Sequence, residues 1–409
     1  MQTSSVQTSP ALAPVAAPQL AGHIPALDAV RGLAILMVTA FRFFPVYDDP
    51  SLAGRYASRL VEFGNRGVDL FFVLSGFLIT GILWDAKNRA HYFRDFYARR
   101  ALRIFPLYYA ALVITLLILP AFGLATSREF ACGDQYAPWL WLYGTNILQS
   151  IQGSWCLGAF NHFWSLAVEE HFYLVWPLVI YFCSRRAAIT VCIAAIVLSM
   201  VSRGVWLYSG GNEIAAQVFT PFRVDALALG GLLAFVARSP GGLKTIRPWA
   251  IAVCLAIFVS MLPPIQLHKR VPALRETLYA FLCAGVIVLA VIPVANKSWT
   301  RLWKLPALRF FGKYSYGMYV VQNFLKAAIP PEVVIAGIAT VIGSVFWSRC
   351  TYLALMSIAT VAAALLSWNL LEKHFLHLKH YFEPKQSTDP PREPVLLQPT
   401  LRLAPHTAE

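Results

Sequence analysis

The chain has 409 residues, of which 58% are hydrophobic and only 13% are charged. Soluble domains average about 25% charged residues, so this composition argues against a soluble globular protein. The formal net charge of +14 does not indicate a nucleic-acid partner, because no nucleic-acid-binding motif is visible and basic residues of membrane proteins gather in cytoplasmic loops.

Apolar stretches long enough to cross a bilayer recur along the whole chain. They predict an all-α integral membrane protein, built as a bundle of about ten transmembrane helices. In chain order the expected spans are 27–46, 68–84, 105–122, 163–183, 187–208, 218–236, 249–263, 276–295, 314–331 and 350–371. Residues 332–347 are apolar but short and follow two prolines, which predicts a re-entrant or interfacial segment, or an extension of a neighbouring span.

The expected bundle, residues 26–375, is flanked by segments of different composition. Residues 1–25 contain no Lys or Arg, which predicts a disordered cytoplasmic tail rather than a signal peptide. Residues 376–409 predict a second cytoplasmic tail that is mostly disordered. Outside the spans, the side that would hold both tails carries 21 Lys and Arg and the opposite side carries 8. This asymmetry predicts that both termini are cytoplasmic.

The seven cysteines do not have the spacing of a zinc or iron–sulfur site, so no metal is expected. Cys132 and Cys156 both fall in the segment 123–162, which is expected outside the membrane. Their position is compatible with a disulfide and equally with two free thiols.

The first charged group opens span one with the sequence LDAVRG at residues 27–32. An ionisable residue costs roughly 3 kcal/mol at the centre of a bilayer, so such groups usually have a partner or a function. Arg42 follows Arg31 by about three helical turns, which places both on one face roughly 16 Å apart. Asp28 can pair with Arg31 at the i,i+3 spacing. Arg31 therefore either serves a site or extends to the interface beside a structural Asp.

A basic segment precedes the third span, where Arg99, Arg100 and Arg103 are followed by Tyr108. Arg100 and Arg103 share a helix face because they are three residues apart. Guanidinium groups bind phosphate at two points, so a cytoplasmic arginine pair suits the phosphates of an acyl-CoA. The alternative is that these arginines only anchor the topology or contact lipid headgroups.

The densest polar group opens span four. His162, Ser165 and Glu169 fall near one helix face, and Glu170 and His171 follow directly. Two carboxylates and two histidines within ten residues can hold a proton or orient a base, so these four are candidate catalytic residues.

Three further groups are compatible with either helix packing or function. They are Asp69 with Ser75-Gly76 in span two, Arg223 and Asp225 with Gly230-Gly231 in span six, and Ser315-Tyr316 with Glu372 at the cytoplasmic face.

Taken in order, these segments resemble the acyltransferase-3 family. The segments that carry the resemblance are LDAVRG at 27–32, VDLFFVLSGFLIT at 68–80, RRALRIFPLY at 99–108, WSLAVEEHFYLVWPL at 164–178 and SYGMY at 315–319. The resemblance implies a ten-span bundle that transfers an acyl group, usually acetyl, from cytoplasmic acyl-CoA to a hydroxyl. It implies sugars, glycolipids or small molecules as acceptors, and it assigns the CoA-binding cations to Arg31, Arg100 and Arg103.

The chain departs from the family pattern at two histidines. The histidine regarded as the base falls at Arg42, and a second frequent histidine falls at Gln322. Arginine stays charged in proteins and cannot accept the proton. Three explanations are open. The protein is an inactive relative that binds acyl-CoA or acceptor, or another residue supplies the base, with Glu169, Glu170, His162 and His171 as candidates. The third is that residue 42 differs from the residue in the natural protein.

Two other functional classes fit a bundle with buried charges. One is a transporter or flippase of small metabolites, and the other is a non-catalytic binding protein of the membrane. The lipid bilayer is an expected partner in every case. The resemblance implies a bacterial cytoplasmic (inner) membrane as the location.

Overall fold

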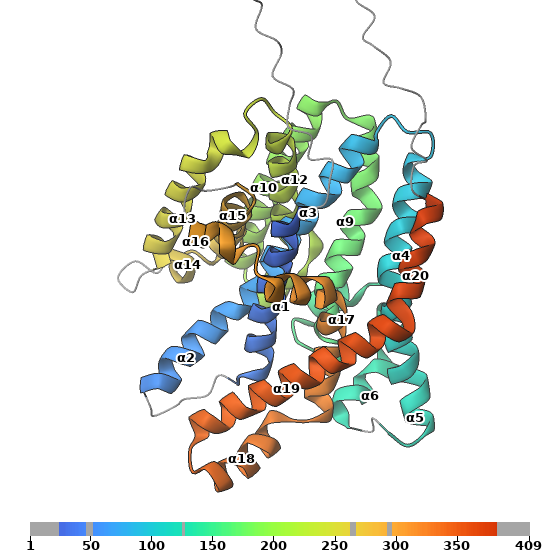
Figure 1. Cartoon of the computed structure of the whole chain (residues 1–409), viewed down its shortest axis with the longest axis vertical. Helices are drawn as coiled ribbons and strands as arrows, with labels where there is room; N and C mark the ends of the chain where they lie inside the picture. Colours follow the sequence, from blue (N-terminus) through green and yellow to red (C-terminus); the bar gives the residue numbers. More distant parts are fainter. Residues whose placement is uncertain (1–23, 46–51, 125–126, 262–266, 293–296, 383–409) are drawn as a thin grey trace, which may run out of the picture.

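The computed structural model describes residues 24–45, 52–124, 127–261, 267–292 and 297–382. These residues form helices joined by turns and contain no strand (Figure 1). Each of the ten expected spans overlaps one long helix, and the third, 105–122, continues beyond its helix through a π-helical turn at Ile114–Ile118. In chain order these helices are α1 (Pro25–Phe43), α3 (Gly67–Ala86), α4 (Tyr92–Val113), α9 (Phe163–Phe182), α10 (Arg185–Tyr208), α12 (Thr220–Ala237), α13 (Arg247–Met261), α15 (Pro272–Val291), α17 (Pro306–Ala328) and α19 (Val345–Ser367).

Short helices connect the long ones. They are α2 (Leu52–Glu62), α5 (Leu119–Ala121), α6 (Arg128–Gln135), α7 (Ala137–Trp141), α8 (Thr145–Gln152), α11 (Glu213–Val218), α14 (Leu267–Arg270), α16 (Lys297–Leu302), α18 (Pro331–Ile342) and α20 (Lys373–His377). The apolar segment after Pro330 is α18, which bends by 69° from α17 and packs along α19 (Figure 1).

Within the described residues, seven helices are long and apolar enough to cross a membrane, or eight if α17 and α18 form one broken span. Helices α1 and α9 are not among the seven. Helix α1 carries Asp28, Arg31 and Arg42, and α9 carries two adjacent carboxylates. Helix α17 also passes this test only together with α18. The two helices that fail it altogether, α1 and α9, carry candidate catalytic residues.

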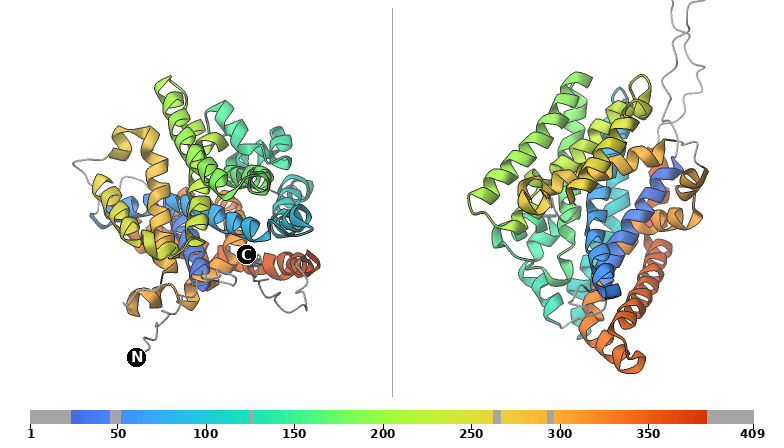
Figure 2. Two further views of the ribbon diagram at one scale, coloured as in Figure 1. Left: turned by 90° about the horizontal axis from the view of Figure 1, so that it is seen from above. Right: turned by 90° about the vertical axis from the view of Figure 1, so that its left-hand side faces the viewer.

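The bundle has an inside and an outside. In the apolar windows of α3 and α12, 72% of residues are buried, whereas the windows of α13 and α19 are only 17% and 22% buried. Seen from above, α1 and α3 (blue) lie in the middle of the molecule and α10 (lime green) projects at its edge (Figure 2). The exposed apolar helices are the ones expected to face lipid.

Glycines bring the central helices into close contact. A Cβ atom at Gly76 of α3 would lie 1.9 Å from the carbonyl oxygen of Leu227 on α12, and one at Gly230 would lie 2.0 Å from that of Val73. Helices α1 and α17 cross in the same way, because a Cβ at Gly32 would lie 1.9 Å from the oxygen of Leu308. These glycines are required for packing, which is the usual role of small residues between membrane helices.

A buried ion network ties α3, α12 and α15 together. Arg223 pairs with Asp69 and, at 2.5 Å, with Glu276, while Arg66 lies 2.6 Å from Glu276 and 3.4 Å from Asp69. Asp69 and Arg223 are each about 2% exposed. This places both residues in helix packing rather than in a cavity.

Asp225 forms a second buried pair, with Arg203 of α10 at 3.2 Å. It also accepts a hydrogen bond from Thr277 at 2.7 Å. Asp225 is therefore satisfied by neighbouring helices as well.

Cys132 and Cys156 are free thiols in the structure, so the disulfide considered for them is not present. The Cys132 thiol instead donates to the carbonyl of Arg128 one turn earlier on α6, at 3.3 Å. Burial raises the pKa of the Cys156 thiol above its usual value.

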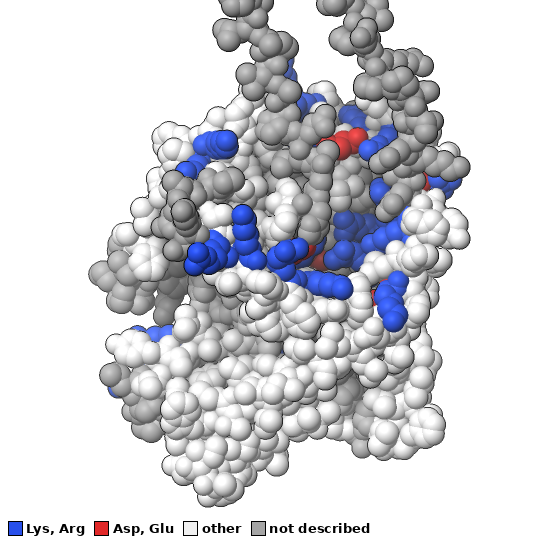
Figure 3. Space-filling model, in the orientation of Figure 1, with Lys and Arg blue, Asp and Glu red and all other residues white. Residues whose placement is uncertain are grey.

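Lys and Arg side chains are unevenly distributed over the surface. Figure 3 shows them gathered in the upper half of the molecule, whereas the lower half of this face is almost free of charge. The lower half includes the region of α18, α19 and α6 (Figure 1).

Candidate active site

Three cavities lie along the helices that carry the sequence motifs. The basic cavity, of about 580 Å³, is lined by Asp28, Arg31, Arg103, Pro306, Arg309, Phe310, Gly312, Lys313, Tyr316, Trp368, Glu372 and Leu376. The central cavity, of about 110 Å³, is lined mainly by α1, α3, α4, α9 and α17 and includes Arg31, Phe71, Ser75, Arg100, Arg103, Ser165, Glu169, Tyr173, Ser315, Tyr316 and Tyr319.

The third cavity, called here the His162 cavity, has a volume of about 620 Å³. Its polar and aromatic lining consists of Phe41, Arg42, Asn65, Glu129, Trp155, Asn161, His162, Trp164, Gln217, Asn323, Lys326 and Glu332. The basic and central cavities share three residues, Arg31, Arg103 and Tyr316. They are therefore neighbouring compartments of one site.

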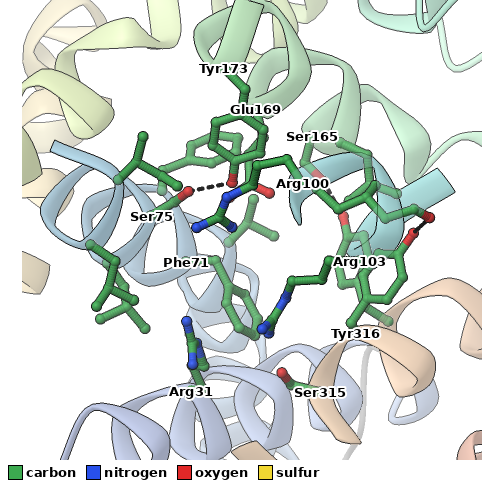
Figure 4. Close-up of a pocket in the computed structure, with 18 residues that line it drawn as sticks. Arg31, Phe71, Ser75, Arg100, Arg103, Ser165, Glu169, Tyr173, Ser315 and Tyr316 are labelled. Carbon is green, nitrogen blue, oxygen red and sulfur yellow. Dashed lines mark hydrogen bonds between the residues drawn. The ribbon is translucent and has the colours of Figure 1, made fainter. Parts of the chain in front are cut away.

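The three predicted CoA-binding arginines come together at this junction. Arg31 extends from α1, and Arg100 and Arg103 extend from consecutive turns of α4, all toward the central cavity (Figure 4). Arg31 keeps its predicted partner Asp28 at 3.3 Å. Arg100 lies over the ring of Tyr173, 5.4 Å from its centroid. Three cations from two distant segments thus converge at one place.

Glu169 is the carboxylate of the central cavity. It lies on α9 beside Arg100, and Figure 4 shows the two side chains next to each other. Ser75 and Tyr173 form a hydrogen bond of 2.5 Å across the same cavity. Glu169 is close enough to Arg100 and Arg31 to balance part of their charge.

Glu170 and His171 point elsewhere, because successive residues on a helix are separated by about 100°. Neither lines any of the three cavities. The Oε1 atom of Glu170 is buried and has no hydrogen-bond partner among the described residues. His171 is bonded through Nδ1 to Thr220 Oγ1 at 2.8 Å. The cluster that is continuous in sequence is therefore divided in space.

His162 and Arg42 line the third cavity together. The two side chains are close enough to interact electrostatically. The backbone oxygen of His162 accepts a bond of 3.0 Å from the Tyr319 hydroxyl, which in turn lies 2.5 Å from Ser165 Oγ. Because Ser165 and Tyr319 line the central cavity, this hydroxyl pair stands between the central cavity and His162.

Two predicted donor-binding residues lie away from the cavities. Arg99 donates to the carbonyl of Asp95 on its own helix at 2.9 Å. Tyr108 is fully buried, and its hydroxyl donates to the carbonyl of Leu140 at 2.6 Å. Both contacts are those of structural residues. Gln322 stands where the family pattern has its second histidine. It is buried, and its Oε1 lies 3.5 Å from Thr39 Oγ1.

Several lining residues were not singled out from the sequence, although helical spacing could have found them. Tyr173 follows Ser165 and Glu169 at a spacing of four residues, and Tyr319 follows Ser315 at the same spacing. Arg309 and Lys313 of the basic cavity have the same spacing. No group of three His, Cys, Asp or Glu able to hold a metal occurs in the part of the chain that the structure describes.

Comparison with known proteins identifies the family. A family model described as an acyltransferase domain matches residues 24–369. The chain belongs to the acyltransferase-3 family. The match begins just before α1 and extends just past the end of α19. It includes all the residues that line the central and His162 cavities, and all those of the basic cavity except Glu372 and Leu376.

Curated relatives agree with the family. YrhL of Bacillus subtilis is 28% identical over 376 residues, which cover 86% of this acyltransferase and 54% of the relative. The peptidoglycan O-acetyltransferase OatA of Listeria monocytogenes is 27% identical over 73% of this chain and 48% of its own length. The O-acetyltransferase OatA of Staphylococcus aureus is 26% identical over 73% of this chain and 50% of its own.

The chain thus spans about half the length of the curated relatives that it matches. No solved structure matches it.

Proposed function

We propose that this protein transfers an acyl group, most simply acetyl, from cytoplasmic acyl-CoA to a hydroxyl of a sugar or glycolipid. The observation that carries the proposal is the succession of cavities: basic, then central, then the His162 cavity. A donor with phosphates at one end and an acyl group at the other fits the first two, and the third is left for the acceptor.

The basic cavity has the chemistry of a CoA site. Arg31, Arg103, Arg309 and Lys313 line it and can contact the phosphates of the nucleotide. Phe310 and Trp368 supply aromatic surface for an adenine ring. The smaller central cavity suits the narrow pantetheine arm and the acyl group that follows it.

The His162 cavity has the chemistry of a sugar site. Trp155 and Trp164 offer flat apolar faces. Asn65 and Gln217 line the cavity, and their amides can bond the hydroxyls of a sugar. All three relatives are named as O-acetyltransferases, two of them for peptidoglycan, which supports a glycan as the acceptor class.

The orientation follows from the charges. The end of the bundle that holds the basic cavity is proposed to be cytoplasmic, with ten spans and both termini on that side. The gathering of Lys and Arg over one half of the molecule supports this arrangement (Figure 3). The proposed location is the cytoplasmic membrane of a bacterium.

The test uses the full chain in lipid nanodiscs, with radiolabelled acetyl-CoA and a mixture of bacterial glycans and glycolipids. We expect labelled ester in the acceptor fraction. Arg103→Gln should raise the KM for acetyl-CoA about tenfold or more, because a charge-assisted bond to phosphate contributes about 1.5–3 kcal/mol. Arg99→Gln is the matched control and should leave KM unchanged.

A second function is favoured by one observation, the arginine at position 42. An inactive relative would bind acetyl-CoA in equilibrium dialysis and form no ester with any acceptor. A transporter would instead move labelled acceptor into proteoliposomes without acylating it. Either result would overturn the transfer proposal.

A further inference from the structure

His162 is held in the geometry of a base. Its Nε2 lies 3.1 Å from the carbonyl oxygen of Val320, and a carbonyl can only accept, so Nε2 carries the hydrogen in the neutral ring. Nδ1 is then the basic lone pair. It is buried and has no hydrogen-bond partner among the described residues, and the residue is 1% exposed yet lines a cavity.

Aromatic rings fix the orientation of this imidazole. The ring centroids of Phe163, Tyr319 and Phe324 lie 4.4, 5.5 and 5.6 Å from that of His162. A side chain locked by packing and by one hydrogen bond loses little freedom when a substrate arrives.

Arg42 supplies an unneutralised positive charge beside this ring. Its Nε is buried without a partner, and no carboxylate of the described residues forms an ion pair with it. Its neighbours are the Tyr319 phenol and the His162 imidazole. Lys326 of the same cavity interacts with Glu129 and Glu332, and it is also close enough to Arg42 for the two cations to repel each other.

We propose that His162 and Arg42 divide between them the work that the family pattern gives to one histidine at position 42. His162 Nδ1 accepts the proton of the acceptor hydroxyl, and the Arg42 guanidinium stabilises the negative charge on the acyl carbonyl oxygen. The assignment rests on the proposed acyl transfer.

The proposed transfer is an addition to the thioester followed by loss of the CoA thiolate. The acceptor oxygen forms a bond to the thioester carbonyl carbon while its proton moves to Nδ1. The carbonyl π electrons become the oxyanion facing Arg42, and their return breaks the carbon–sulfur bond. The CoA thiolate leaves and takes the proton from the imidazolium, which restores neutral His162 and gives free CoA and an ester.

The two substrates can meet at this place. The acyl group arrives through the central cavity, whose wall includes Ser165 and Tyr319, and the acceptor arrives through the His162 cavity. The hydroxyl pair of Ser165 and Tyr319, 2.5 Å apart, lies between the two cavities. Both hydroxyls donate to the backbone oxygen of His162, so the pair holds the turn that carries His162 in place.

The test measures steady-state acyl transfer to a glycan mixture, together with acetyl-CoA binding by equilibrium dialysis. His162→Gln should lower kcat about a hundredfold or more, which is the usual contribution of a general base. Arg42→Gln should lower kcat about a hundredfold, with acetyl-CoA binding unchanged. Arg42→Lys should keep most of the rate because it keeps the charge.

Two matched controls and one rescue separate catalysis from structure. His171→Gln removes a histidine of the same helix that faces no cavity, and Arg94→Gln removes an exposed cation that lines none of the three cavities; both should leave kcat within about threefold. Adding Arg42→His to His162→Gln should restore transfer, because it returns a base to position 42.

Retained activity in His162→Gln, or equal loss in Arg42→Lys and Arg42→Gln, would overturn the assignment. If the unmodified chain forms labelled ester and His162→Gln keeps that rate, the assignment fails while the proposed function survives. If the unmodified chain is inactive and Arg42→His alone transfers acyl groups, both fail for this chain. If neither chain transfers or hydrolyses acetyl-CoA, both fail.

Discussion

Arg31 and Arg42 lie on one helix but serve different cavities: Arg31 lines the basic and central cavities, and Arg42 lines the His162 cavity. Eleven residues of α-helix separate them by roughly 16 Å. Helix α1 therefore spans the whole proposed path of the acyl group, from the CoA phosphates to the acceptor. Substitutions at its two ends should produce different kinetic defects.

Glu169 and Glu170 provide the sharpest test of which carboxylate serves the site. Glu169→Gln should lower acyl transfer at least tenfold, since it leaves three arginines of the central cavity without their carboxylate. Glu170→Gln should keep transfer within about threefold, because Glu170 lines no cavity and Gln retains its shape. The measurement is initial rate at saturating acetyl-CoA, and the reverse order would show that the side chains exchange places when substrate binds.

The close helix crossing at Gly76 predicts a stability effect. Gly76→Ala should lower the melting temperature in detergent, with a cost of about 1–3 kcal/mol for overpacking, since its Cβ would lie 1.9 Å from the Leu227 oxygen. Gly337→Ala is the matched control. A Cβ at Gly337 meets nothing within 4 Å, so this variant should melt at the same temperature or higher.

The buried ion network predicts an asymmetry between single and double variants. Arg223→Gln should destabilise the protein by about 3–5 kcal/mol, because Asp69 and Glu276 both lose a buried partner. Adding Asp69→Asn should recover part of this loss. Arg94→Gln breaks an exposed pair with Asp95 and should change the free energy of unfolding by less than about 1 kcal/mol.

Thiol labelling tests both the orientation and the cysteine chemistry. In intact spheroplasts a membrane-impermeant maleimide should label Cys132 without prior reduction, because the thiol is free and the segment is proposed to face outward. Cys156 should react slowly near neutral pH and faster as the pH rises, since burial raises the pKa of its thiol and the thiolate is the reactive form. Cys183, at the proposed cytoplasmic end of α9, should remain unlabelled until the cells are opened. Labelling in the opposite order would reverse the orientation.

Local sequence patterns were sufficient to place the long helices and the arginines of the proposed donor site. Arg100 and Arg103 are three residues apart, so they share a face if this segment is helical. A charged residue in an apolar span, such as Arg31, needs an interaction partner. What the sequence could not reveal is long-range pairing. Arg66 bonds to Glu276, 210 positions away in the sequence. Only the assembled bundle shows that Asp69 and Arg223 belong to the same buried ion network and not to the candidate site.

The same limit applies to the polar run on α9. Spacing placed His162, Ser165 and Glu169 on one face, and the structure keeps Ser165 and Glu169 in one cavity. His162 lies just before the helix and faces a different cavity. That separation depends on Tyr319 of α17, which packs against the turn where α9 begins.

The contact between α1 and α17 also restricts the movement of these two helices relative to each other. The two backbones are in close contact where Gly32 meets Leu308 and where Gly312 meets Asp28. Helices α1 and α17 therefore behave as one rigid unit, which carries Arg31 and Tyr316. If CoA binds as proposed, room for its nucleotide would come from the walls that face these two helices, among them α4. That helix carries Arg100 and Arg103 and runs into a π-helical turn at Ile114–Ile118, an irregularity that is frequent at functional sites.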